Sequence, residues 1–98
     1  MVKIVEESLE DRTIARNMKT LVEVTKELLG KDSVDERTAN FVGIINGFMV
    51  NEELLISPPI NENYQISVPE EKYFDTAMKL AEAYEKAIGK EITVRKNY

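Results

Sequence analysis

The pattern of apolar and polar positions predicts two amphipathic helices, one in each half of the chain. From residue 9 to residue 29, apolar side chains recur at helical spacing on one face, and Gly30 is a typical C-terminal cap. Residues 69–88 repeat the pattern, with Pro69 and acidic residues at the start and Gly89 at the end. The predicted apolar faces comprise Ile14, Met18, Leu21, Val22, Thr25, Leu28 and Leu29 in the first helix, and Tyr73, Phe74, Ala77, Met78, Ala81, Tyr84 and Ile88 in the second.

Short segments in which apolar and polar residues alternate predict strands. They span residues 2–6, 54–57, 64–68 and 91–97. We expect Pro58 and Pro59 to stop the second of these strands, because proline cannot donate a hydrogen bond to a sheet. Residues 57–63 are rich in proline and asparagine, which predicts an exposed loop.

The stretch NFVGIINGFMVN, residues 40–51, supports two interpretations. Asn46-Gly47 between apolar runs is typical of a β-hairpin turn. Ser33 and Glu36, in contrast, form a capping box that favours a helix. At helical spacing the large apolar side chains fall on one side and the glycines on the other, whereas a hairpin would leave apolar residues on both faces. We therefore expect a helix over residues 41–49 and keep the hairpin as the alternative.

Together these elements predict one domain over residues 1–98, with the element order β-α-α-β-β-α-β. Removing one helix from this order gives β-α-β-β-α-β, the split β-α-β or ferredoxin-like arrangement. We therefore expect a two-layer α+β fold, a ferredoxin-like variant with an extra helix, in which helices cover one face of a single sheet.

The residues that most often carry catalysis are missing from the chain. It contains no cysteine and no histidine, which removes thiolate nucleophiles, the usual general base and the commonest transition-metal ligands. Adjacent acids such as Glu70-Glu71 precede helices, where the helix dipole favours them. No serine has a base at a catalytic spacing. We expect no catalytic residue, no cofactor and no metal site, and the sequence argues against an enzyme.

The net charge of −5 is unevenly distributed, since residues 31–71 carry two basic and eight acidic side chains. Nucleic-acid binders need a basic surface, so the acidic centre argues against a nucleic-acid partner. No apolar run is long enough to span a membrane, and the acidic N-terminal residues are unlike a signal peptide, so we expect a cytoplasmic protein. The high lysine and glutamate content is also typical of thermophiles.

These observations favour a non-enzymatic interaction or regulatory domain that self-associates. The predicted elements offer more apolar faces than a small core uses, so we expect a homo-oligomer or another protein as partner. An edge strand or the helix 41–49 would form the contact, and Ile60 would be presented on a stiff loop. The candidate contact residues are Phe41, Gly43, Ile45, Gly47, Phe48, Ile60 and Tyr64.

Two other functions stay open. A small-ligand-binding domain or an accessory subunit of an enzyme rests only on analogy with other ferredoxin-like sheets. An anion or nucleic-acid binder would use the basic residues near the chain ends, among them Lys86, Lys90, Arg95 and Lys96.

Overall fold

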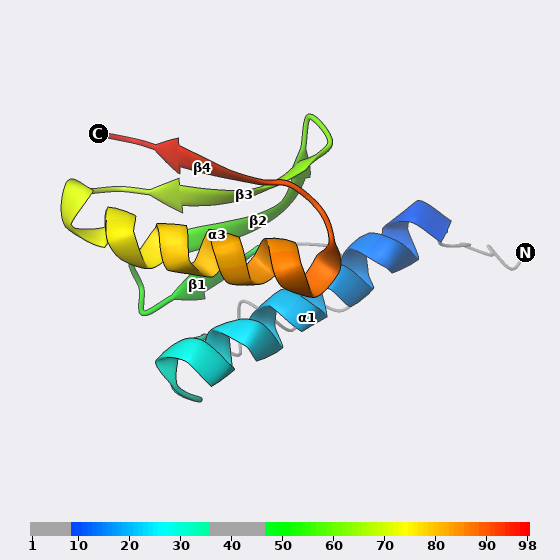
Figure 1. The fold of residues 1–98 in the computed structure, drawn as a ribbon, viewed down its shortest axis with the longest axis horizontal. Helices are drawn as coiled ribbons and strands as arrows, with labels where there is room; N and C mark the ends of the chain where they lie inside the picture. Colours follow the sequence, from blue (N-terminus) through cyan, green and yellow to red (C-terminus); the bar gives the residue numbers. More distant parts are fainter. Residues whose placement is uncertain (1–8, 36–46) are drawn as a thin grey trace, which may run out of the picture.

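The computed structural model describes residues 9–35 and 47–98, which form a two-layer α+β fold (Figure 1). Within these residues, two helices lie on one face of a four-stranded sheet. The helices are α1 (Leu9–Leu29) and α3 (Phe74–Ile88), the latter preceded by the 3-10 turn η1 (Glu71–Tyr73). The strands are β1 (Phe48–Val50), β2 (Leu54–Ile60), β3 (Asn63–Val68) and β4 (Ile92–Lys96).

The strands follow one another in the sheet in the order β1-β2-β3-β4. β1, β2 and β3 are antiparallel neighbours, whereas β4 is parallel to β3 and is reached through α3. The ferredoxin-like topology is not confirmed, because a split β-α-β unit needs a strand between its two parallel strands and here they pair directly. The predicted strand at residues 2–6 lies outside the described residues.

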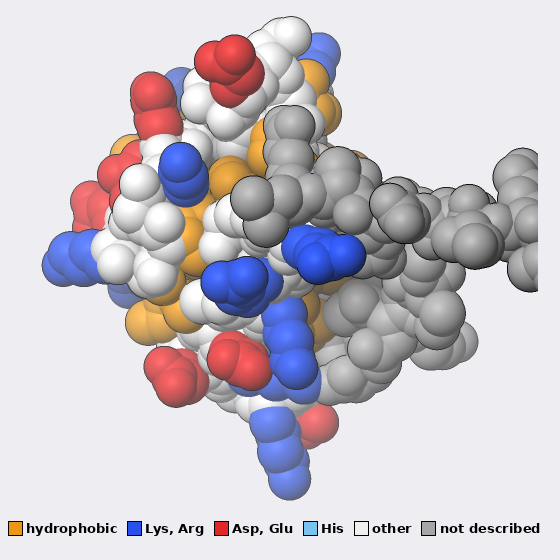
Figure 2. Space-filling view, turned by 90° about the vertical axis from the view of Figure 1, so that its right-hand side faces the viewer, with side chains coloured by type: hydrophobic (Ala, Val, Ile, Leu, Met, Phe, Trp, Pro, Cys, Tyr) orange, Lys and Arg blue, Asp and Glu red, His pale blue; other side chains and the backbone are white. Residues whose placement is uncertain are grey.

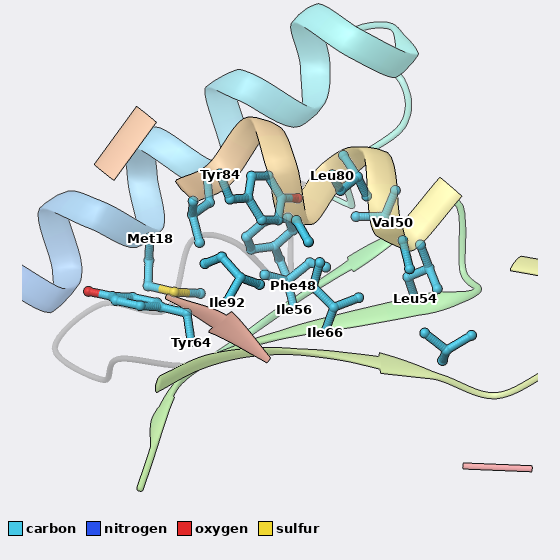
Figure 3. Close-up of a cluster of buried hydrophobic side chains, with 14 of the residues drawn as sticks. Met18, Phe48, Val50, Leu54, Ile56, Tyr64, Ile66, Leu80, Tyr84 and Ile92 are labelled. Carbon is cyan, nitrogen blue, oxygen red and sulfur yellow. The ribbon is translucent and has the colours of Figure 1, made fainter. Parts of the chain in front are cut away.

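Alternate side chains of each strand point toward the helices and form the core (Figure 3). Met18 of α1 lies beside the ring of Tyr64, while Leu80 of α3 lies beside Val50 and Tyr84 lies above Phe48. Each large side chain buried in this way contributes about 1.5–3 kcal/mol. The core from the sheet comprises Phe48, Val50, Leu54, Ile56, Tyr64, Ile66, Val68 and Ile92.

The predicted helix 9–29 is confirmed, and the second predicted helix begins later than expected. Residues 71–73 form η1 and α3 starts at Phe74, while Gly89 ends it with a left-handed φ of 65°. The predicted apolar faces were partly wrong, because Leu28 and Met78 are 50% and 39% exposed. Leu80 was not assigned to the apolar face, yet it is fully buried.

The predicted helix 41–49 is wrong at its C-terminal end, because Phe48 and Met49 belong to β1. The rest of that segment, including Ala39 and Gly43, lies outside the described residues. Ser33 is buried and its hydroxyl donates to the carbonyl of Gly30 at 2.6 Å.

The strand prediction for residues 54–57 was too short, since β2 continues through Pro58 and Pro59 to Ile60. β1 pairs with β2 only as far as Ile56, so among the described residues the prolines have no β1 neighbour that needs an N–H donor. The register also shifts between Ser57 and Ile60. The expected loop 57–63 is therefore mostly strand, and the turn is Asn61-Glu62, with φ of 52° and 75°.

Side-chain hydrogen bonds fix α1 against its neighbours in the core. Thr25 donates to the carbonyl of Leu21 at 2.7 Å, so the Tyr84 hydroxyl is the donor in its 2.5 Å bond with Thr25. Asn17 donates to the Tyr64 hydroxyl at 2.9 Å. Burial raises the pKa of Tyr84 far above its ordinary value of about 10.

Gly47 is required by close packing between the start of β1 and β2. A Cβ at this position would lie 2.1 Å from the carbonyl oxygen of Ile56, and backbone cannot give way cheaply. We predict that Gly47→Ala lowers the free energy of unfolding by at least about 2 kcal/mol in urea titrations. Gly89→Ala is the control, because nothing lies within 4 Å of a Cβ at this position. Its positive φ should lower the free energy of unfolding by only about 1 kcal/mol. Equal losses in the two variants would contradict close packing at Gly47.

Tyr84 should make the protein sensitive to alkali. Above about pH 10 the unfolded chain releases the Tyr84 proton while the folded chain keeps it, so the free energy of unfolding falls as the pH rises. We predict that Tyr84→Phe costs about 1 kcal/mol near neutral pH but flattens this fall. Urea unfolding from about pH 8 to 11 measures both effects. Tyr98→Phe, at an exposed position, is the control, and the same slope in all three proteins would contradict the interpretation.

Candidate functional site at the β4 edge of the sheet

β4 forms one edge of the four described strands (Figure 1), and half of its backbone groups point away from β3. The N–H of Asn97 donates to the carbonyl of Val68 at 2.8 Å, which fixes the phase of the ladder. In a parallel ladder both backbone groups of a residue point to the same side, and successive residues alternate. The backbone groups of Ile92, Val94 and Lys96 therefore point to the outer edge.

A side chain of α3 occupies the first of these positions. The N–H of Ile92 donates to a carboxylate oxygen of Glu85 at 3.2 Å. Among the residues that the structure describes, none pairs with the outward N–H and C=O groups of Val94 and Lys96. These groups are placed to receive an additional strand.

One flank of α3 runs beside this edge. At one end of the flank, the Lys96 Nζ atom lies 4.6 Å from the centre of the Phe74 ring. At the other end, the Glu85 carboxylate accepts the hydrogen bond from the Ile92 N–H. Met78 follows Phe74 by four positions, so it lies on the same flank between these contacts. We call β4 together with Phe74, Met78 and Glu85 the edge site.

The edge site offers apolar surface next to the outward backbone groups of Val94 and Lys96. Met78 is 39% exposed, and Phe74 and Val94 are half-buried. An added strand would direct alternate side chains toward α3, where Met78 and Phe74 could cover them. The arrangement can therefore bind an extended chain through both backbone and side chains.

Charge is distributed unequally along the edge site. Glu91, which is exposed, and Glu85 lie at the first end of β4, whereas exposed Arg95 and Lys96 lie at the last. A strand that enters this site therefore meets Glu85 and Glu91 beside Lys90 at one end, and only basic residues of β4 at the other.

The basic residues near the C-terminus do not form a single group. Lys86 and Lys90 precede β4, while Arg95 and Lys96 lie at its far end. Figure 2 shows Lys and Arg side chains at the end of the molecule where α1 begins and α3 finishes. The exposed basic residues of these two segments are Arg12, Arg16, Lys19, Lys86 and Lys90.

The residues proposed from sequence as partner contacts do not come together in the described part of the chain. Phe48 and Tyr64 are 1% and 4% exposed, so both have interior positions. Gly47 packs on the backbone of β2, and only Ile60, at 46% exposed, presents a side chain beside the β2–β3 turn. Phe41, Gly43 and Ile45 lie outside the described residues.

Sequence reasoning named an edge strand as a possible contact, but it identified neither β4 nor the flank of α3, because the residues of the edge site carry no motif. Met78 has helical spacing with Phe74 and was therefore assigned to the core. The phase of the β4 hydrogen bonds depends on the parallel pairing with β3, which periodicity does not reveal. The alternation in residues 91–97 showed a strand, and the charges of Arg95 and Lys96 were the available signal for an edge.

The described residues contain no group of three or more His, Cys, Asp or Glu side chains that could hold a metal ion. Within the same residues, no helix combines the length and the apolar character needed to cross a membrane. No known protein family, curated protein or solved structure matches the chain.

Proposed function

We propose that the protein is a non-enzymatic interaction module that binds an extended segment of a partner at the edge site. The observation that carries this proposal is the outward direction of the Val94 and Lys96 backbone groups beside the exposed Met78. Backbone hydrogen bonds would supply affinity, and contacts with α3 would supply selectivity.

Two features of the edge favour a specific partner over unrestricted aggregation. Glu85 already occupies the Ile92 N–H, which shortens the stretch open to a new strand. Arg95 and Lys96 place charge on the remainder, a common protection against indiscriminate pairing. A partner must therefore offer a short extended segment whose charges suit this edge.

A display library of proline-free random peptides, selected on the immobilised protein, tests the proposal. We expect micromolar binders whose amide chemical-shift changes in NMR spectra concentrate on β4 and on the Phe74–Met78 flank. Met78→Glu should weaken them by about tenfold or more, because it places a charge where apolar side chains pack.

Leu28→Glu is the matched control, since it makes the same kind of change at an exposed apolar residue of α1. It should leave peptide affinity unchanged. Peptides that bind but shift α1 signals, or that are equally weakened by both variants, would place the site elsewhere. A selection that yields no binder, made under conditions in which the protein is monomeric, would count against the interaction at this edge.

A further inference from the structure

We infer that the segment which occupies the edge site is β4 of a second copy of this chain, antiparallel to the first about a two-fold axis. The inference rests on the proposed function, because it names the partner of the same site. Glu85 and Glu91 lie at the first end of β4. Arg95 and Lys96 lie at the last end. Antiparallel pairing brings opposite ends together, so the acids of each copy meet the bases of the other.

The charges also select a register. Centring the axis on Arg95 places this arginine opposite its own copy, and like charges directly opposite are destabilising. Centring it on Thr93 places Lys96 opposite Lys90 of the second copy, which is again a like-charge pair. Centring it on Val94 removes both directly opposed pairs, places Lys96 opposite Ile92 of the second copy, and leaves Lys90 only diagonal to Lys96.

The Val94-centred register also agrees with the free backbone groups. The Val94 N–H of each copy would donate to the Val94 carbonyl of the other, because both groups point outward. The Lys96 N–H would donate to the Ile92 carbonyl of the second copy. The Ile92 N–H keeps its bond to Glu85, so no described internal hydrogen bond is lost.

Helix packing supports the same arrangement. α3 lies over β3 and β4, and neighbouring strands are about 4.8 Å apart, so the two-fold axis places the two α3 helices side by side. Helices pack at about 8–10 Å, which brings the Phe74–Met78 flank of one copy against that of the other. Such a dimer covers Met78 and explains why an apolar side chain is exposed there. A two-fold contact is also closed, so it ends at the dimer.

A charge swap across the interface tests the inference. Glu91 and Arg95 are exposed, so their substitution leaves the core intact, and in this dimer each lies diagonally across from the other in the second copy. At low ionic strength we expect the wild type to sediment as a dimer at micromolar concentration. Glu91→Lys alone and Arg95→Glu alone should each weaken the dimer by about tenfold, because each creates two like-charge pairs. An equimolar mixture should recover dimerisation as a heterodimer visible in native mass spectra.

Glu62→Lys and Lys31→Glu make the same charge changes at exposed positions outside β4 and should leave the dimer unchanged. A monomeric wild type, a mixture that does not recover, or equal effects of the controls would overturn the inference. If the wild type is monomeric but Met78-dependent peptides bind, the second copy is not the partner and the proposed function stands. If neither peptides nor a second copy bind, both proposals fall together.

Discussion

The parallel pairing of β3 with β4 is the constraint on which the rest of the structure depends. Parallel neighbours need a crossover, and α3 supplies it while burying Leu80 and Tyr84 over the sheet. The same pairing fixes which backbone groups of β4 bond to β3 and which point outward. It also sets the flank of α3 beside the edge, with Phe74 near Lys96 at one end. The core, the outward groups of β4 and the flank of α3 are therefore all consequences of the β3–β4 pairing.

The described helices cover only one face of the sheet, and the apolar side chains they leave exposed differ in their surroundings. Leu28 and Leu29 lie at the end of α1, Leu55 lies on β2 and Ile60 lies beside a turn, and scattered exposed apolar residues of this kind are ordinary. Met78 instead lies beside outward backbone groups of β4 with which no described residue pairs. Apolar surface beside an open strand edge indicates a binding site more strongly than exposed apolar surface alone. Burial of apolar side chains and backbone hydrogen bonds then both stabilise the same bound segment.

Periodicity and capping residues predicted α1, α3, β3 and β4, because these elements bury one clear face and end at glycine or at turns. They failed where contacts with residues distant in the sequence determine the local structure. Phe48 joins β1 because β2 lies beside it, although its local spacing favours a helix. Pro58 lies in the register shift between β2 and β3, and no described residue of β1 pairs with it. Met78 has the spacing of a core residue, and only the position of β4 shows that it lies at an edge.

Amide hydrogen exchange along β4, measured residue by residue in solution dilute enough for the protein to be monomeric, tests the central claim most directly. We predict alternation, with slow exchange at Thr93, Arg95 and Asn97, whose amides point to β3. Val94 and Lys96 should exchange fast, because their amides point outward. Uniform protection along the strand in dilute solution would show that the edge is already paired and would contradict the account.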